Sequence, residues 1–350
     1  MEPELTQNLF GLDISQQVLR LVQVKKKGKK LALAAYGEVP VPAGAIANGE
    51  VASADVLVGA IGKLLKSTHG DKVTTRNVVT VLPEQKTFIK VITVTADSTV
   101  SLVDRIRDEA RNHIPLNLDE AYFDWQLLRQ NGKTASVLIG VAPQPIVDAY
   151  LAVLDKAGLV VHALEIEAAA ITRSLVGKNE NRTTMVIDFG AIRTGLVIYS
   201  NNAVSFTTSL PISGNGITKT IADTLKIDLK KAEEAKIICG LDPAKCEGAL
   251  RKVLNSAINA LVTRIKQTAT FYQTSFIDQP AIGSIILCGG GANILSIDTL
   301  LAEKLKLPVT VGSPMIHLTA SSKVVIPPPQ LLSYTTAIGT ALRPFQRSLP

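Results

Sequence analysis

The chain has 350 residues, 46% of them hydrophobic and 19% charged, so it can form buried cores and is not expected to be disordered. Lysine and arginine outnumber aspartate and glutamate by 37 to 30, a modest basic excess that suits phosphates, anionic lipid or an acidic partner without selecting one. Aromatic residues make up only 4%, too few for a base-stacking surface, and no zinc-finger or RNA-binding motif is present, so no nucleic-acid partner is expected.

The first part of the chain predicts strands followed by a helix. The lysine cluster Lys25–Lys30 falls where a hairpin turn should be. Such a cluster is most often a solvated tip, and contact with anionic lipid or an acidic partner is the sharper alternative. The predicted elements are strands over Leu9–Ile14, Val18–Lys25 and Leu31–Val39, a helix over Ala54–Ser67 and a strand over Asn77–Leu82.

Residues 84–162 predict a small α+β unit of their own. Ser101 with Asp104 is a capping signal for one helix, and Pro145 begins a second helix that Gly158 closes. Alternating apolar residues between and before these helices predict strands, of which the last two can pair. These strands are predicted over Phe88–Val94, Tyr122–Leu128 and Ser136–Ala142.

The rest of the chain alternates between strands and helices. Residues 214–281 are predicted to be mostly helical, with one helix capped by Asp228 and ended by Gly240, and a long one that starts at Pro243. A buried-type strand then enters the glycines Gly289–Gly291. The other predicted elements are strands over Thr184–Ile187, Leu196–Tyr199, Val204–Ser209 and Ser284–Leu287, and a short helix over Tyr334–Leu342.

The cysteines and the hydropathy pattern indicate the compartment. Cys239, Cys246 and Cys288 form no CxxC pair and are odd in number, so we expect neither a zinc site nor a disulfide framework, and a reducing cytosol. The N-terminus does not resemble a signal peptide, and no run of about 18 uncharged apolar residues predicts a membrane span. Another protein or a surface patch would have to hold such a chain at a membrane.

A weak internal repeat links the two halves. Asp13 and Asp188 each end an apolar strand and are followed by a tight turn and a further strand. Duplicated lobes with equivalent aspartates are one way to grip a nucleotide triphosphate, whose Mg²⁺ needs few carboxylates and whose phosphates need small turn residues. Each signal alone is weak, because a strand-ending Asp is more often a turn or cap residue and three glycines are more often a plain loop.

The order of these pieces resembles the actin/Hsp70/hexokinase superfamily. Gly11–Ile14 resembles its phosphate loop 1, Asp188–Thr194 resembles phosphate loop 2, and Cys288–Ala292 resembles the adenosine motif. Glu165–Ala168 and Thr336–Ala341 resemble the two connecting helices. The resemblance implies an α/β fold of two actin-like, ribonuclease H-like lobes around a nucleotide cleft, with a small inserted α+β domain.

Within this superfamily the chain resembles the PilM family of type IV pilus assembly proteins. Ile106–Leu116, Asp124–Leu128 and Val137–Pro143 carry that resemblance. It implies a cytoplasmic protein that binds ATP or ADP with Mg²⁺ and sits peripherally at the inner membrane. Its implied partners are the cytoplasmic tail of a PilN-like bitopic inner-membrane protein, docked at 84–162, and other pilus assembly proteins. Self-association stays open.

The same resemblance divides the chain into lobes. The first lobe would comprise 1–83, with 163–180 and 335–345 returning to it, and 84–162 would be the inserted partner-docking domain. The second lobe would comprise 181–213 and 282–334, with 214–281 as its helical subdomain.

The resemblance also assigns the site residues. Asp13 and Asp188 would hold Mg²⁺ through water, and Glu167 is the candidate for orienting the attacking water. Glu233 and Lys236 share one helix face, where the carboxylate would accept ribose hydroxyls; the alternative is a surface ion pair. The other candidate nucleotide contacts are Ser15, Gln16, Gln17, Gly190, Arg193, Thr194, Gly214, Gly289, Gly290 and Gly291.

Two departures from the family pattern bear on activity. Ser15-Gln16-Gln17 stands where the first loop usually continues with glycine and small hydroxyl residues, and Ile192 and Arg193 stand where the second loop usually carries hydroxyl residues. Arg193 would either pair with a phosphate or fill the slot. We therefore expect at most a slow ATPase.

Two other functions of the superfamily are alternatives to a pilus assembly scaffold. The division protein FtsA has an extra domain at a similar place, but it ends in an amphipathic membrane helix, which the proline-broken segment Leu342–Pro350 is too short to form. A filament-forming ATPase of that type is therefore the alternative reading. A small-molecule kinase of the superfamily would need a catalytic Asp facing an acceptor hydroxyl, and no such residue is identified.

Overall fold

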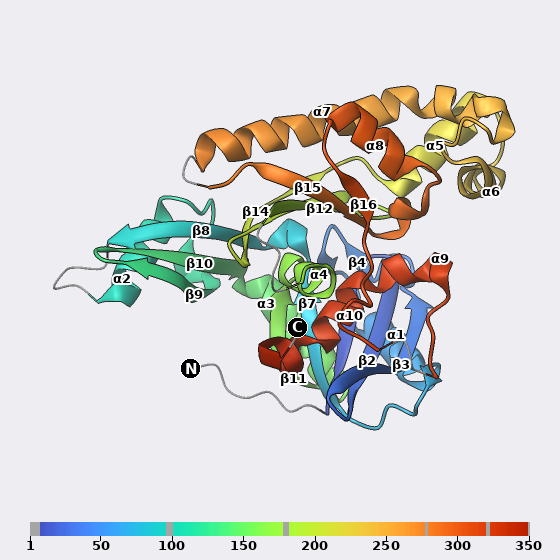
Figure 1. Cartoon of the computed structure of the whole chain (residues 1–350). Helices are drawn as coiled ribbons and strands as arrows, with labels where there is room; N and C mark the ends of the chain where they lie inside the picture. The colour runs from blue at the N-terminus through green and yellow to red at the C-terminus, as the bar shows by residue number, and fades with distance from the viewer. Residues whose placement is uncertain (1–7, 96–100, 178–181, 277–278, 320–322, 349–350) are drawn as a thin grey trace.

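The computed structural model describes residues 8–95, 101–177, 182–276, 279–319 and 323–348, and it forms two lobes, each built on its own β-sheet (Figure 1). The lobes meet at a pair of helices, α4 (Glu167–Leu175) and α10 (Thr335–Ala341). The predicted α/β class with two actin-like lobes is confirmed.

The first lobe contains a six-stranded sheet in the order β11-β7-β1-β2-β3-β6. Helices α1 (Ala54–Lys66) and α3 (Gln144–Lys156) pack on one face of it and share one apolar core. The lysine cluster lies at the exposed tip of the β2–β3 hairpin, where Gly28 takes a left-handed conformation, as predicted. The strands of this lobe are β1 (Phe10–Ile14), β2 (Val18–Lys27), β3 (Lys30–Pro40), β6 (His69–Gly70), β7 (Asn77–Leu82) and β11 (Val160–Ile166), with a two-stranded pair β4 (Ile46–Ala47) and β5 (Glu50–Val51) beside them.

The second lobe contains most of an eight-stranded sheet in the order β16-β15-β12-β13-β14-β8-β10-β9. The long helix α7 lies across one face of this sheet and buries a row of aliphatic side chains against it (Figure 1). The elements of this lobe are β12 (Thr183–Phe189), β13 (Thr194–Ser200), β14 (Ala203–Leu210), β15 (Ile282–Cys288), β16 (Val309–Val311), α5 (Gly214–Leu225), α6 (Leu229–Cys239), α7 (Ala249–Ser275), α8 (Ile297–Leu305) and α9 (Pro328–Leu331).

The internal repeat is visible in the strand pairing. β1 pairs with β2 in antiparallel fashion and with β7 in parallel, while β12 pairs with β13 in antiparallel fashion and with β15 in parallel. Asp13 and Asp188 thus occupy equivalent places near the ends of two equivalent strands. The duplication brings the two aspartates to opposite sides of one cleft.

The inserted unit has a small core of its own. Strands β8 (Phe88–Thr95), β9 (Ala121–Asn131) and β10 (Thr134–Pro143) pack against helix α2 (Leu102–Arg111) through Ile106, Ala110 and their neighbours. The Ser101 hydroxyl accepts the backbone N–H of Asp104, which confirms the predicted cap. A single pairing of Lys90 with Phe206 joins β8 to β14 and continues the sheet of the second lobe.

Helix α3, and strand β11 that begins at the end of the 84–162 segment, pack in the first lobe. Helix α3 buries Tyr150 and Leu154 in the core that α1 lines, and β11, absent from the prediction, pairs in parallel with β7. Sequence adjacency could not show which sheet these segments pack on. The part of this segment that has a core of its own therefore runs from β8 to β10.

The region between α6 and α7 differs from the prediction in two ways. Cys239 and Cys246 form a disulfide, whereas no disulfide was expected; only Cys288 is a free thiol. The long helix begins at Ala249 rather than at Pro243, because Cys246, Glu247 and Gly248 all have positive φ values that a right-handed helix does not accept.

The connecting helices touch at very close range. A Cβ atom on Gly339 of α10 would lie 1.9 Å from the carbonyl oxygen of Ala170 in α4, so only glycine permits this crossing. The buried guanidinium of Arg173 donates to both oxygens of Glu165, at 2.7 and 2.6 Å, and to the Gly339 carbonyl at 2.8 Å. This ion pair ties α4 to β11 and α10 at the junction of the lobes.

Candidate functional site

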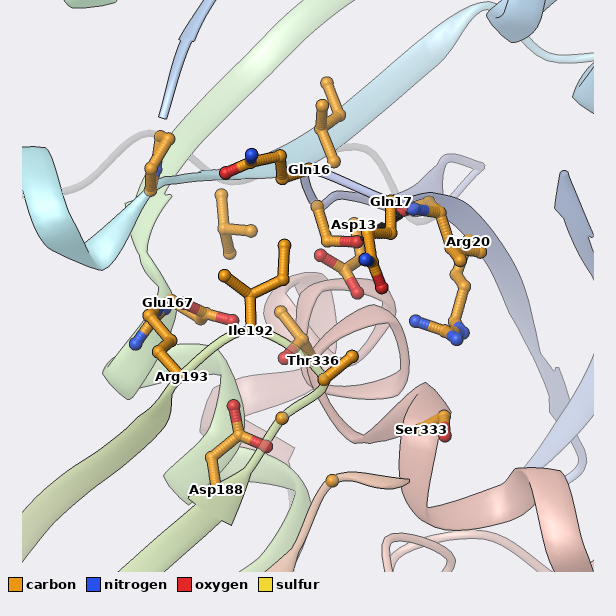
Figure 2. A pocket seen from close by; sticks show the side chains of 18 of the residues that line it. Asp13, Gln16, Gln17, Arg20, Glu167, Asp188, Ile192, Arg193, Ser333 and Thr336 are labelled. Carbon is orange, nitrogen blue, oxygen red and sulfur yellow. Dashed lines mark hydrogen bonds and ion pairs between the residues drawn. The ribbon is translucent and has the colours of Figure 1, made fainter. Parts of the chain in front are cut away.

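The cleft between the lobes encloses a cavity of about 200 Å³, and its walls come from both lobes (Figure 2). The first lobe contributes the turn after β1, the end of β7 and the start of α4, while the second contributes the turn after β12 and the glycines after β15. Of the residues proposed from sequence, those that line this cavity are Asp13, Ser15, Gln16, Gln17, Glu167, Asp188, Gly190, Arg193, Gly289 and Gly290.

Asp13 is a buried carboxyl on the first-lobe wall, with 6% of its surface exposed. Burial, with the charges of Glu167 and Asp188, raises its pKa to about 7 against the opposing effect of Arg20 and Arg193. Arg20 pairs with Asp13 in the β1–β2 register and is itself held by Glu38 at 3.1 Å. The carboxyl thus faces the cleft in a setting that favours its neutral form or a bound cation.

Asp188 faces Asp13 from the second lobe, and the turn at Gly289 leaves room for the Asp188 side chain. A Cβ atom on Gly289 would lie 2.4 Å from the Asp188 Oδ1, and Gly289 has a φ of +76°, so no other residue fits there without displacing the carboxylate. The Cys288 thiol lies 3.8 Å from the same oxygen. Burial, with the Glu167 charge, raises the pKa of Asp188 above its ordinary value.

Arg193 reaches across the cleft to two carboxylates of the first lobe. Its Nη1 donates to Glu84 Oε2, and its Nη2 donates to Glu167 Oε2 at 2.5 Å. Burial acts to lower the pKa of Arg193, but the Glu167 and Glu84 charges outweigh it and raise that pKa above its ordinary value. Burial in turn raises the pKa of Glu84 to about 7, against the attraction of Arg193.

The remaining predicted residues lie behind the second-lobe turn. The Lys236 ammonium contacts Glu233 at 2.6 Å, Thr218 at 2.8 Å and the Gly214 carbonyl at 3.3 Å, so it ties α6 to the start of α5. Thr194 is fully buried and donates its hydroxyl to the Ile212 carbonyl at 2.6 Å. Gly214, Thr194, Glu233, Lys236 and Gly291 do not line the cavity.

Sequence reasoning missed Tyr150, which lines the cavity, and Glu84, which pairs with Arg193 beside it. Glu84 follows Pro83 directly after β7, a parallel neighbour of β1, so the rule that pointed to Asp13 as a strand-end acid would also have pointed to Glu84. Tyr150 of α3 donates its hydroxyl to the Gly49 carbonyl at 3.2 Å and helps close the first-lobe wall. No local pattern would have found Tyr150, because it reaches the cleft only through the packing of α3.

The described residues contain no direct metal cage and no membrane span. Among them, no group of three or more His, Cys, Asp or Glu side chains is placed to hold a metal ion. No helix in the same ranges is long and apolar enough to cross a bilayer.

The duplicated sheets, the crossed connecting helices and the cleft between the lobes define an actin-like protein. MreB5 of Spiroplasma citri, in a structure bound to ADP, shares this fold with a TM-score of 0.55 and 14% identity over 97% of each chain. The ethanolamine utilization protein EutJ of Carboxydothermus hydrogenoformans shares it with a TM-score of 0.57 and 16% identity, over 95% of this chain and 88% of that one.

Sequence similarity narrows the class to one family. The chain belongs to the type IV pilus assembly protein PilM family, whose sequence profile matches residues 11–345. A solved PilM-PilN type IV pilus biogenesis complex is similar to it, with a TM-score of 0.79 and 26% identity over 98% of this chain and 99% of that chain. The cell division protein FtsA of Neisseria meningitidis serogroup B is 25% identical over 206 residues, 53% of this chain and 49% of that protein. The chain spans about half the length of the curated relatives it matches.

Proposed function

We propose that this protein is an ATP-binding scaffold of the type IV pilus assembly machinery, held at the inner membrane by the cytoplasmic tail of a PilN-like bitopic protein. The observation that carries the proposal is the likeness to a PilM-PilN complex over 98% of this chain, together with the family match. The cleft between duplicated lobes supports the nucleotide part of the proposal.

The residues of the cleft fit a nucleotide. Gly289 and Gly290 line the cavity on one side, where a ribose and base would lie, and the turns after β1 and β12 would face the phosphates. Asp13 and Asp188 provide two hard oxygen ligands on opposite walls, which suits Mg²⁺ held mostly through water. Bound Mg²⁺ would supply positive charge to the phosphate oxygens and to these two carboxylates.

Hydrolysis, if any, would be slow. Glu167 is the carboxylate best placed at the cleft to orient water, but its Oε2 already accepts from Arg193. Turnover should therefore fall far below the ~1–10³ s⁻¹ of ordinary enzymes. The proposed role is that of a nucleotide-dependent scaffold.

The partner tail would dock on the inserted unit. β9 is the terminal strand of the eight-stranded sheet, and its side chains Tyr122 and Leu127 are 49% and 42% exposed. An extended peptide can pair with such an edge, and pockets for alternate side chains give specificity. The exposed Lys25–Lys30 tip would add electrostatic attraction to anionic lipid.

The test uses a synthetic peptide of the partner's cytoplasmic tail and calorimetry on the full chain. Tyr122→Glu with Leu127→Glu should abolish micromolar binding, whereas Ile237→Glu on α6, which replaces a side chain that is 62% exposed, should leave it unchanged. Unaltered peptide affinity in the β9 double variant would refute docking at this edge.

A further inference from the structure

The second phosphate loop is held across the cleft before any ligand enters. Arg193 comes from the turn between β12 and β13, while Glu84 follows β7 and Glu167 begins α4. The guanidinium donates to both carboxylates and is largely buried, with 18% of its side chain exposed. One side chain of the second lobe is thus held by two carboxylates of the first lobe.

This arrangement occupies the space that a triphosphate would need. The cavity of about 200 Å³ is smaller than the ~300–1,000 Å³ of typical small-molecule sites. Figure 2 shows Ile192, Arg193 and Gln16 extending into the cleft from opposite walls. A nucleotide can enter only if some of these side chains move.

Arg193 lies at one end of the cleft. Ser333, whose hydroxyl would lie 3.4 Å from a Cβ atom on Gly290, marks the glycine side, and Figure 2 places it away from Arg193 and Glu167. With the nucleoside against the glycines, the phosphate chain would run toward Arg193. The last phosphate would therefore be the group that meets the guanidinium.

Glu84 is incompletely satisfied in this state. Its side chain is 8% exposed, its Oε2 accepts from Arg193, and its Oε1 is buried with no hydrogen-bond partner among the described residues. A buried acceptor without a donor costs free energy. A ligand whose anionic group matches the guanidinium better can therefore replace Glu84 as the partner of Arg193.

We propose that Glu84 is a specificity-determining residue of this cleft, which competes with the terminal phosphate of a nucleoside triphosphate for the guanidinium of Arg193. The inference rests on the proposed nucleotide binding. A triphosphate takes Arg193 from Glu84 in bidentate fashion, as phosphate oxygens match the guanidinium fork. A diphosphate, which ends one phosphate short, leaves the ion pair in place. Glu84 acts through Arg193 and is a positioning residue.

The test compares ATP and ADP affinity by calorimetry at fixed Mg²⁺ in the full chain and in Glu84→Gln. The amide keeps the shape of the side chain and can still accept a hydrogen bond from Arg193, but it removes the negative charge that attracts the guanidinium. ATP affinity should rise about tenfold, the effect of roughly one pK unit of charge interaction, while ADP affinity should change less than about threefold. Glu50→Gln is the matched control, because Glu50 is a more exposed carboxylate that pairs at 2.5 Å with Lys86, two residues from Glu84.

A second variant separates action through Arg193 from a purely structural effect. Glu84→Gln in an Arg193→Met background should give no gain in ATP affinity, because the guanidinium that Glu84 restrains is gone. Arg193→Met alone should lower the ATP-to-ADP affinity ratio, and an unchanged ratio overturns the proposed exchange whether or not Glu84→Gln folds.

The outcomes distinguish this inference from the proposed function. Wild-type protein that binds ATP, with a Glu84→Gln variant that binds it no better or gains equally for ADP, overturns the role of Glu84 alone. A gain in ATP affinity from Glu84→Gln that persists in the Arg193→Met background also overturns the role of Glu84. Absence of binding of either nucleotide to both wild type and Glu84→Gln overturns the proposed nucleotide binding as well.

Discussion

The stability of the ligand-free protein should increase as the pH falls from 8 to 6. Burial raises the pKa of Glu84 to about 7 in the folded state, against a value of 4.5 for a free glutamate. As the pH falls between these values, the folded state takes up a proton on Glu84 while the unfolded state stays ionised. For a carboxyl with a raised pKa, stability is present below the unfolded pKa and falls as the pH rises through the folded pKa, so acidification to pH 6 is stabilising.

The magnitude follows from the two pKa values. Lowering the pH from 8 to 6 takes Glu84 from almost fully ionised to almost fully protonated in the folded state, which is worth about 1.4 kcal/mol by the linkage relation. Asp13, with a pKa raised to about 7, adds a similar amount in the same direction. The two are not additive, because both carboxyls interact with Glu167 and Asp188.

The assay is thermal unfolding of wild type, Glu84→Gln and Glu50→Gln at pH 6, 7 and 8 and constant ionic strength. Glu84→Gln should be the more stable protein at pH 8 and should lose about 1.4 kcal/mol of the pH dependence, whereas Glu50→Gln should follow wild type. An identical pH slope in wild type and Glu84→Gln would refute the assignment of a buried, charge-strained carboxyl to Glu84.

Three further outcomes follow from the structure. Arg173→Met should lower the free energy of unfolding by about 3–5 kcal/mol in denaturant titrations, because it leaves the buried Glu165 carboxylate short of its bidentate partner; a loss under 1 kcal/mol would contradict this. Asp188→Ala should weaken ATP binding with Mg²⁺ more than without it, and equal affinity changes in both calorimetric titrations would count against a metal role. Gly289→Ala should abolish ATP binding, since its Cβ atom would lie 2.4 Å from Asp188 Oδ1; wild-type affinity would show that the turn can adapt.

The sequence predicted the parts of the fold that depend on local periodicity. The strand-ending Asp13 and Asp188 were placed correctly because an apolar run followed by an acid and a turn is readable within a few residues. The end of α6 at Gly240 and the cap of α2 at Ser101 were also predicted, since capping depends on side chains next to the helix end.

What the sequence did not predict depends on contacts between distant segments. The Cys239–Cys246 disulfide requires a loop that returns on itself through left-handed residues, and cysteine spacing alone does not show this. Tyr150 reaches the cleft only because α3 packs on the first sheet. Whether Arg193 meets a phosphate or fills the slot was open, because the answer depends on Glu84, which is more than 100 positions away in the chain.

The charges in the cleft explain why a ligand-free protein of this kind would hold its second phosphate loop closed. Asp13, Glu167 and Asp188 line one partly buried space, and the buried Glu84 adjoins it through Arg193; burial of unpaired carboxylates is expensive. Arg193 offsets part of that cost only by reaching across to the opposite lobe. A ligand that binds together with a cation and pairs a phosphate with Arg193 also offsets the cost of burying these carboxylates. The contact of Arg193 with Glu84 and Glu167 is thus the contact that a nucleotide must replace, and the free energy of that exchange sets how tightly the nucleotide binds.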